Sequence, residues 1–426
     1  MGAQDTLRCR PAAADQEQIV TAQRKIAVFT GNRAEYGLQL PILKAIKRHP
    51  DLECQLIVSG AHLDPYFGRT LAEITKDGFD VAAQVQIDVP DDTIRSTPYA
   101  IGSGVLGITQ SLANLRPDLM VVYADRFEGF AAIIAATQMG IPTAHLEGGD
   151  VTEGGALDDS VRHAMTKLAH LHFTTNLQAT NRLLAMGEEP WRVQTVGFPM
   201  IDLIVEGNFS SRTDVQQRFK FDLTRPIVLF TQHSVTTEAE CSVTQIGASL
   251  AALERLAKEG IQVLATYPNN DAGGRRIVVE LKKFAGAGVP NFQLYPSLGR
   301  RDYHGTLALT LDPKIRIACV GNSSSGIKES PAFGCPTVNI GSRQLGRLRA
   351  KNVIDSGYDV NAIYAATQRC LFDEEFRAAC RNCENPYGKG NVGPQVADTL
   401  ARVPLDGRLL HKRMTLLGET HDGWYR

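Results

Sequence analysis

The sequence predicts an α/β protein built from two Rossmann-like, doubly wound domains. Short runs of apolar, often β-branched residues alternate with longer stretches of helical periodicity throughout the 426 residues, and this alternation is typical of βαβ units. The apolar runs are hydrophobic at nearly every position, which favours parallel strands covered on both faces. Gly and Pro interrupt the series near residues 197–202, so we expect one sheet on each side of this break.

The expected elements follow in chain order. Before the break, we expect strands at Lys25–Thr30, Cys54–Ser59, Leu119–Ala124, Pro142–Leu146, Leu171–Thr175 and Val193–Val196. After it, we expect strands at Ile227–Thr231, Val263–Tyr267, Phe292–Tyr295, Ile315–Val320 and Thr337–Ile340. The clearest helical patterns lie at Leu38–Arg48, Phe130–Met139, Ala164–Leu168, Ala179–Met186, Ser242–Glu259 and Arg275–Phe284.

These elements divide the chain into four segments. We expect a loosely ordered leader over residues 1–24, which is polar and has no apolar core of a signal peptide. An N-terminal domain over 25–200 and a C-terminal domain over 201–394 follow. The tail over 395–426 has a helical pattern and is expected to pack back on the N-terminal domain.

The composition is that of an ordinary soluble globular protein, with 43% apolar and 21% charged residues. A formal net charge of −1 gives no basic surface, so neither nucleic acid nor an anionic membrane is an expected partner. No apolar run approaches the roughly 18–20 residues that cross a bilayer. The eight cysteines are scattered, which favours reduced thiols and a cytoplasmic location. Cys380 and Cys383 have no second pair and predict no zinc or redox site.

Polar residues gather where the expected strands end. In open parallel sheets, ligands bind beyond the carboxyl ends of the strands. Six such ends in two domains therefore suggest a cleft into which both sheets point. The polar segments are Gly31–Gly37, Asp125–Glu128, Glu147–Asp150, Gln232–Thr237, Asn269–Asp271 and Gly321–Gly326.

The densest of these regions is His145–Lys167, which combines histidines, carboxylates, an arginine and glycines. Buried charge at this density is costly unless it is paired or used. Structural readings remain open: Asp125 and Arg126 could form an ion pair that caps the sheet, and Asp158 could pair with Arg162 at i, i+4. The histidines His163, His170 and His172 are better explained as structural than as metal ligands, and no metal or cofactor is expected.

Two glycine-rich segments have different meanings. Gly321–Gly326 would present N–H groups and hydroxyls to an anion at the start of a helix, although a capped helix start explains it equally well. Arg343 and Arg347 could contact a diphosphate or lie on a solvated face. Gly102–Gly107 matches G-x-G-x-x-G but does not directly follow a strand, so it does not indicate NAD.

Taken together, the motifs resemble one family over about residues 25–403. Eight segments occur in order: Asn32–Tyr36, Asp125–Phe127, His145–Gly149, Asp158–His163, Gln232–Thr237, Pro268–Gly273, Gly321–Ser324 and Gly341–Arg347. In combination they are similar to the hydrolysing UDP-N-acetylglucosamine 2-epimerases of sialic-acid and related nonulosonic-acid biosynthesis. Asn32-Arg33-Ala-Glu35-Tyr36 resembles the hydrolysing branch rather than the non-hydrolysing one.

The resemblance implies a GT-B arrangement, with the active site between the domains, UDP held mostly by the second domain, no metal, and a homodimer or homotetramer. The implied reaction converts UDP-N-acetylglucosamine and water to UDP and N-acetylmannosamine through a 2-acetamidoglucal. The implied catalytic residues are Asp125, Glu147, Asp158, His233 and Arg162. The implied substrate-binding residues are Arg33, Gly37, His145, Asn269, Asp271, Asn322, Ser323, Ser324, Glu329 and Arg343.

Within this set, Asp125, Glu147 and Asp158 would handle the protons, and His233 would meet the diphosphate or protonate the leaving group. Two features depart from the family: Tyr123-Ala124 precedes Asp125 where many members carry His-Gly, and the loop from Gly149 to Asp158 is slightly longer than in the animal enzymes. Alternatives are the same chemistry on UDP-2,4-diacetamido-2,4,6-trideoxyglucose, a GT-B glycosyltransferase, or a nucleotide-sugar sensor.

Overall fold

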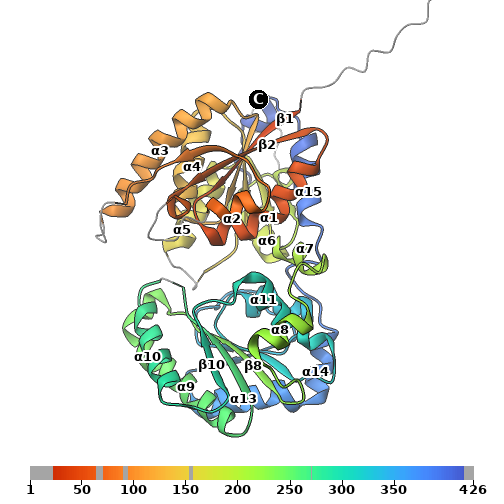
Figure 1. Ribbon diagram of the computed structural model, residues 1–426. Helices are drawn as coiled ribbons and strands as arrows, with labels where there is room; N and C mark the ends of the chain where they lie inside the picture. The colour runs from red at the N-terminus through yellow and green to blue at the C-terminus, as the bar shows by residue number, and fades with distance from the viewer. Residues whose placement is uncertain (1–22, 64–70, 90–94, 153–156, 270, 417–426) are drawn as a thin grey trace, which may run out of the picture.

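The computed structural model describes residues 23–63, 71–89, 95–152, 157–269 and 271–416. It contains a seven-stranded sheet in the order β3-β2-β1-β4-β5-β6-β7 and a six-stranded sheet in the order β10-β9-β8-β11-β12-β13 (Figure 1). All the recorded strand pairs are parallel. In each sheet the order reverses direction once, between β1 and β4 and between β8 and β11. The predicted α/β class with two doubly wound sheets is therefore confirmed.

The first sheet lies in what we call the first half of the molecule. Its strands are β1 Arg24–Thr30, β2 Leu52–Ser59, β3 Val81–Val85, β4 Leu119–Tyr123, β5 Thr143–Leu146, β6 Leu171–Thr174 and β7 Val193–Thr195. The second sheet lies in the second half. Its strands are β8 Ile227–Thr231, β9 Gln262–Thr266, β10 Phe292–Tyr295, β11 Ile317–Gly321, β12 Thr337–Ile340 and β13 Val353–Ser356.

The helices connect and cover these strands. Those up to the break are α1 Arg33–Arg48, α2 Leu71–Lys76, α3 Ser96–Leu115, α4 Phe127–Gln138, α5 Leu157–Leu168, α6 Leu177–Ala185 and α7 Met200–Val205. Those of the second half are α8 Arg212–Phe219, α9 Ser242–Lys258, α10 Gly274–Gly286, α11 Gly299–Leu307, α12 Ser325–Lys328, α13 Val360–Phe372 and α14 Glu374–Arg381. The chain ends with α15 Val392–Arg402 and α16 Gly407–Leu410.

Every strand predicted from the sequence is present, with ends that differ by no more than two residues. The two strands that the sequence did not reveal, β3 and β13, lie at the outer edges of their sheets. Both are partly exposed along their length. They therefore lack the continuous hydrophobicity that marks strands covered on both faces.

Helices that follow strands begin earlier than predicted. Helix α1 begins at Arg33, where the Asn32 side chain accepts a hydrogen bond from the Glu35 amide, whereas the pattern predicted a start at Leu38. Helix α5 likewise begins at Leu157 instead of Ala164. The first turn of α1 is polar because it lines the cleft, and the first turn of α5 carries Asp158 and Asp159. In both helices the apolar periodicity therefore starts one or two turns late.

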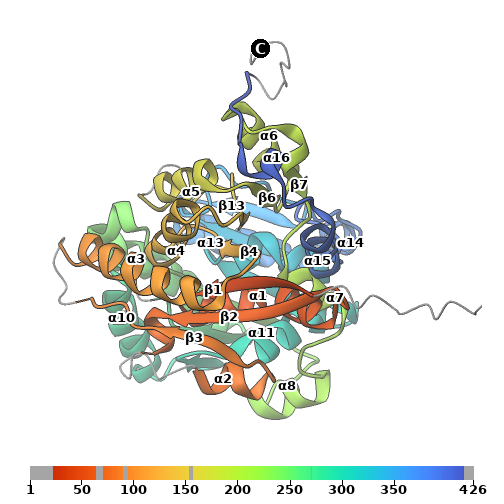
Figure 2. The same ribbon diagram turned by 90° about the horizontal axis from the view of Figure 1, so that it is seen from above.

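Each sheet is covered by helices on both faces (Figures 1 and 2). Helices α3, α4 and α5 pack on one face of the first sheet, and α1 and α15 pack on the other. In the second half, α9, α10 and α13 cover one face. The core of α1, α7 and α15 continues through α8 and α11 into the second half, so one apolar cluster joins both halves.

The chain crosses between the halves at two neighbouring points. The outward segment contains Gly197 and Phe198, and the returning segment contains Tyr387 and Gly388. The Phe198 amide donates a hydrogen bond to the Tyr387 carbonyl at 2.7 Å. After the return, the Asp202 carboxylate accepts hydrogen bonds from the first amides of α15, and α15 lies along α1.

Buried charge fastens the end of the chain to the first half. The ammonium group of Lys412 lies 2.6 Å from the fully buried Glu188 carboxylate. The buried Arg192 guanidinium donates to the carbonyls of Leu409 and Arg408. Most of the expected leader and the last residues of the expected tail lie outside the described residues, and the four-segment division of the chain stays a prediction.

The glycines of Gly102–Gly107 lie inside α3 and have a packing role. A Cβ atom on Gly104 would lie 3.0 Å from the Ala131 methyl group of α4, and one on Gly107 would lie 2.7 Å from Val85. The small residues let α3 approach the sheet and α4 closely. Over the described residues, no helix combines the length and apolar character needed to cross a membrane.

Buried histidines predict that stability falls in mild acid. Burial lowers the pKa of His145 to about 3, and lowers that of His62, His170 and His172 to about 4. Between pH 6.5 and 4 the unfolded chain therefore binds protons that the folded chain does not. The free energy of unfolding should fall with decreasing pH, by up to about 1.4 kcal/mol per pH unit for each histidine.

Urea unfolding at pH 7.5 and pH 5.5 measures this dependence. A His62→Gln variant should weaken this pH dependence by the contribution of one histidine. The variant His411→Gln, at an exposed side chain, should leave the pH dependence unchanged. Equal unfolding free energies at the two pH values would contradict the prediction.

Candidate active site

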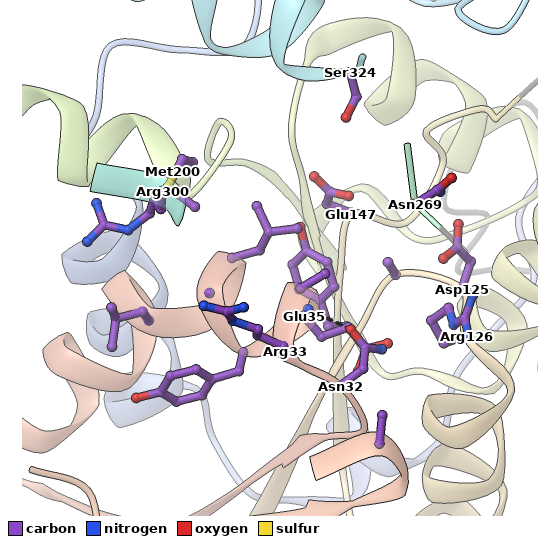
Figure 3. A pocket seen from close by; sticks show the side chains of 18 of the residues that line it. Asn32, Arg33, Glu35, Asp125, Arg126, Glu147, Met200, Asn269, Arg300 and Ser324 are labelled. Atoms are coloured by element: carbon purple, nitrogen blue, oxygen red, sulfur yellow. Dashed lines mark hydrogen bonds between the residues drawn. The ribbon is translucent and has the colours of Figure 1, made fainter. Parts of the chain in front are cut away.

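The carboxyl ends of the two sheets border one large cleft, with a volume of about 2460 Å³. This exceeds the roughly 300–1,000 Å³ of ordinary small-molecule pockets, so an extended ligand fits. Figure 3 shows Glu147 of the first half on the side of the cleft that faces Ser324 of the second. Most of the residues predicted from the sequence line it, namely Arg33, Gly37, Asp125, Glu147, Arg162, Asn269, Asp271, Ser323, Ser324 and Glu329.

Arg162 of α5 organises the wall that the first half contributes. Its buried guanidinium donates to Asp159 at 2.9 Å, to the Asp150 carbonyl at 2.7 Å and to the Thr152 hydroxyl at 2.9 Å, and it pairs with Asp125. Burial lowers the pKa of Arg162 to about 9, so the group is still charged at neutral pH. This one cation therefore fixes the carboxylate that follows β4 and the loop that follows β5.

The predicted pairing of Asp158 with Arg162 is not what the structure records, because Asp159, one residue later, forms the ion pair. Asp158 lies at the exposed start of α5, outside the cleft lining, and its charge acts on Arg126. Residues 153–156, within the predicted loop from Gly149 to Asp158, lie outside the described residues.

Glu147 lies directly after β5 with a positive φ of 60°, a conformation that side chains other than glycine rarely adopt. Its carboxylate is buried and lies 3.2 Å from the ammonium group of Lys328. Lys328 belongs to α12 of the second half and also lies 2.6 Å from Asp150. Burial alone would raise the pKa of Asp150, but Lys328 and Arg347 outweigh it and lower that pKa.

A second pair of carboxyl groups lies at the β1/β4 reversal. Glu35 accepts a hydrogen bond from the Gly31 amide at 2.9 Å, and the Glu128 side chain packs against Gly31 and Gly60. Burial and the neighbouring Glu128 raise the pKa of Glu35 to about 8, and burial raises the pKa of Glu128. At neutral pH this pair therefore holds a proton beside the cleft.

In the second half, the polar loops after β8 and β11 are joined by Asn322. Its side chain accepts from the His233 amide at 2.6 Å and donates to the His233 carbonyl at 2.9 Å. Gly321 before it has a φ of 131°, and a Cβ atom there would lie 1.9 Å from the Thr231 carbonyl oxygen. Only glycine therefore lets the two loops meet at this point.

The His233 ring is held in one tautomer. Its Nδ1 accepts a hydrogen bond from the Asn269 amide at 2.9 Å, so the neutral ring carries its proton on Nε2. Burial, together with the nearby Arg343, lowers the pKa of His233 to about 3. The ring is thus a neutral hydrogen-bond donor unless an anion approaches it.

Other predicted residues of the second half are linked to one another. The Glu329 carboxylate lies 2.7 Å from the buried His304 ring, and Arg343 lies 3.7 Å from Asp271. Arg347 does not lie on a solvated face, because it donates to the Val151 carbonyl of the first half at 2.7 Å. His233, Asn322 and Arg343 lie behind the residues that line the cleft.

His145 lies beneath the wall instead of in it. Its Nε2 donates to the Ala124 carbonyl at 2.7 Å, which supports the left-handed conformation of Ala124, with a φ of 50°. The other histidines of this region have separate partners: His170 bonds Thr143 and His172 bonds Glu188. Among the described residues, no three His, Cys, Asp or Glu side chains are grouped to hold a metal ion.

Sequence reasoning missed several charged residues of the cleft: Glu35, Glu128, Lys328, Arg300 and Arg301. Glu35 and Glu128 lie within strand-end motifs that the sequence did reveal, so a search for every acid in those motifs could have found them. Lys328 had no such signal, because a single lysine after an isoleucine on a short helix predicts an exposed side chain.

Comparison with known proteins supports the resemblance. A sequence profile of a family described as UDP-N-acetylglucosamine 2-epimerase matches residues 44–401. A UDP-N,N'-diacetylbacillosamine 2-epimerase (hydrolyzing) of Legionella pneumophila is 33% identical over 91% of this chain and 98% of that protein. A UDP-N-acetylglucosamine 2-epimerase of Neisseria meningitidis serogroup B is 32% identical over 83% of this chain and 89% of its own length.

Solved structures show the same fold. A crystal structure of UDP-GlcNAc 2-epimerase from Neisseria meningitidis bound to UDP-GlcNAc has a TM-score of 0.69 and 19% identity, and the match covers 89% of this chain and all of that one. A putative UDP-N-acetylglucosamine 2-epimerase from Listeria monocytogenes has a TM-score of 0.71 over 89% of this chain and 96% of that one. The expected GT-B arrangement is thereby confirmed.

Replacing Arg162 should destabilise the protein strongly. In Arg162→Met the carboxylates of Asp125 and Asp159 lose a buried cation, and breaking a buried pair from one side costs about 3–5 kcal/mol. Urea unfolding measures the loss. Adding Asp159→Asn should recover part of it, and Arg276→Met, in an exposed pair, should leave the unfolding midpoint unchanged. A loss below about 1 kcal/mol, the usual value of a surface pair, would refute this role.

Proposed function

Because this chain belongs to the UDP-N-acetylglucosamine 2-epimerase family, we propose that it is a hydrolysing 2-epimerase that converts UDP-N-acetylglucosamine and water to UDP and N-acetylmannosamine. The observation that carries this proposal is the division of charge across the cleft. Acidic side chains outnumber basic ones among the cleft-lining residues of the first half, whereas in the second half arginines, a lysine and serine hydroxyls outnumber the acids Asp271 and Glu329. A UDP-sugar has a matching polarity, with an anionic diphosphate next to an uncharged sugar.

This division orients the substrate. In many doubly wound folds a phosphate binds at the strand-order reversal. Here Glu35 and Glu128 occupy that position in the first half, and their charge disfavours a phosphate. The diphosphate therefore binds at the β8/β11 reversal, near Ser323, Ser324 and His233, and the sugar faces Asp125 and Glu147.

The chemistry needs a base, an acid and support for the leaving diphosphate. The C2 hydrogen of the sugar is not next to a carbonyl group, so it becomes acidic only as the C1–O bond to UDP breaks and positive charge grows at C1. Removal of that hydrogen and departure of UDP give a 2-acetamidoglucal. Water then adds at C1, and a proton adds at C2 from the opposite face, which inverts C2.

The charges of the first half suit these steps. Glu147 lies 3.2 Å from the ammonium group of Lys328, and Asp125 pairs with Arg162. These contacts hold both carboxylates in place, which makes them candidates for the base and for stabilising positive charge at C1. Glu35 and Glu128 share a proton and are candidates for the acid. This separation of roles follows the rule that different environments push the pKa values of neighbouring titratable groups apart. Asp158, the third catalytic carboxylate that the resemblance implies, stays part of the proposal.

The second half would hold UDP. The Nε2–H group of His233 would donate to the diphosphate, together with the hydroxyls of Ser323 and Ser324. Such preformed donors stabilise the negative charge that develops on the leaving group. Glu329, oriented by His304, would accept from the ribose hydroxyls.

The second candidate substrate is UDP-2,4-diacetamido-2,4,6-trideoxyglucose, which is UDP-N,N'-diacetylbacillosamine. It is favoured by the similarity to two proteins named for it, the Legionella pneumophila protein and a GDP/UDP-N,N'-diacetylbacillosamine 2-epimerase of Campylobacter jejuni, which is 34% identical over 84% of this chain. The identity to the Neisseria meningitidis protein is nearly the same, so the choice between the two sugars rests on experiment.

Incubation with each UDP-sugar in D2O tests the reaction. We expect release of UDP and a free sugar with inverted C2 that carries deuterium at C2, because the proton returned to C2 comes from solvent-exchanging groups. NMR of the product gives both readouts. A released sugar of unchanged configuration without deuterium would indicate a transferase or a simple hydrolase instead.

The variants Glu147→Gln and Asp125→Asn distinguish an enzyme from a sensor. Each should lower kcat by at least about 100-fold and leave UDP affinity, measured by calorimetry, within a few-fold of the wild-type value. The exposed Glu53 lies outside the cleft, so Glu53→Gln is the matched control. UDP binding by the wild-type protein without turnover of either sugar would favour the sensor.

The shared proton of Glu35 and Glu128 predicts an alkaline limit to activity. If the protonated form is needed, kcat should fall as the pH rises through about 8. Glu35→Gln cannot release a proton, so it should lower kcat by about 100-fold or more and remove this alkaline limb. The pH profile of kcat measures both effects, and an alkaline limb that persists in Glu35→Gln would exclude the assignment.

A further inference from the structure

Lys328 has contacts that a surface lysine would not have. It ends α12, the short helix that follows the Ser323-Ser324 loop, and its amide donates to the Ser324 carbonyl at 2.9 Å. Although α12 belongs to the second half, the side chain extends into the first half, where it is only 4% exposed. The residue thus connects the proposed diphosphate loop to the opposite wall of the cleft.

The ammonium group has four neighbours. It lies 3.2 Å from Glu147 and 2.6 Å from Asp150, and 4.9 Å and 5.5 Å from the ring centres of Phe198 and Tyr387. The aromatic faces and the carboxylates all attract a cation. One carboxylate would be enough to neutralise it, so contact with Glu147 as well leaves two acids sharing one cation.

This geometry constrains the position of Glu147. Lys328 lies on α12, which directly follows the Ser323-Ser324 loop, so its ion pair with Glu147 sets the distance between that carboxylate and the loop. A base for C2 and a binding site for the diphosphate must lie at a fixed separation, since C2 and the diphosphate are separated only by C1 of the substrate.

We propose that Lys328 is a positioning residue that holds the Glu147 carboxylate at a fixed place relative to the diphosphate loop. This inference rests on the proposed function, because it assigns Glu147 the role of base. Lys328 itself does not exchange a proton in the reaction.

Other charged and titratable groups lie around Glu147 and Asp150. Arg347 acts on Asp150, and burial together with Asp150 raises the pKa of Tyr387. Burial and the Glu147 carboxylate raise the pKa of Tyr123, which stays protonated. Lys328 is therefore the cation nearest to Glu147 among the ion pairs of the described residues.

The test compares Lys328→Met with Lys328→Arg. In Lys328→Met kcat at pH 7 should fall about tenfold or more, because the base is no longer held in place. UDP affinity should change less than about threefold, because the side chain does not reach the diphosphate loop itself. Lys328→Arg should restore most of kcat. A kcat of Lys328→Met equal to that of the wild type would overturn the proposal.

Lys412 provides a matched control, because it is also buried and paired with a carboxylate, Glu188, but lies away from the cleft. Lys412→Met should leave kcat unchanged even if it lowers the unfolding midpoint. If Lys328→Met does not fold, Lys328→Met combined with Asp150→Asn removes one charge of each sign. That variant should show the loss of kcat, whereas Asp150→Asn alone should not.

A double-mutant cycle separates this proposal from the proposed function. Lys328→Met and Glu147→Gln, measured by urea unfolding, should be non-additive if the two side chains interact, and this readout needs no turnover. Additive changes would overturn the positioning role. Absence of turnover with both UDP-sugars, together with a non-additive cycle, would instead reject the proposed function but support the interaction between Lys328 and Glu147.

Discussion

The buried guanidinium of Arg162 determines the form of the cleft wall that the first half contributes. Taking such a cation out of water costs several kcal/mol unless most of its donors are satisfied, and here they meet groups from three segments: Asp125 after β4, Asp150 and Thr152 after β5, and Asp159 on α5 itself. None of these segments would hold its position without the others. The carboxylates at the cleft are therefore fixed by helix α5, which lies mostly behind them.

The two halves share a fold but differ in the charge that they place at equivalent points. Each sheet reverses its strand order once, and each reversal opens a crevice suited to a ligand. In the first half the crevice holds the acids Glu35 and Glu128, whereas in the second it holds Asn322, Ser323 and the neutral ring of His233. A nucleotide sugar that spans both crevices can lie in only one direction. The fold thus provides two similar sites, and side-chain charge makes them chemically different.

Much of this architecture could be predicted from the sequence, because strands covered on both faces have a continuous apolar pattern. The edge strands β3 and β13 lack that pattern, and the first turns of α1 and α5 were missed because they are polar. Motifs at strand ends revealed Asp125, Glu147 and Ser323, since chain order fixes which loops share an edge. The partner of Arg162 was misjudged by one residue, because spacing on a helix allows both i, i+3 and i, i+4 pairs. Lys328 could not be predicted, since its contacts depend on how the halves meet.

The two crossing segments, bonded through Phe198 and Tyr387, would be the pivot of a rotation of one half against the other. Such a rotation would widen the mouth of the cleft most and displace groups near the pivot least. Lys328 lies over the rings of both residues, so its contact with Glu147 would persist while products depart. The proposed base would then keep its place from one catalytic cycle to the next, and opening the cleft would expose the product without resetting the site.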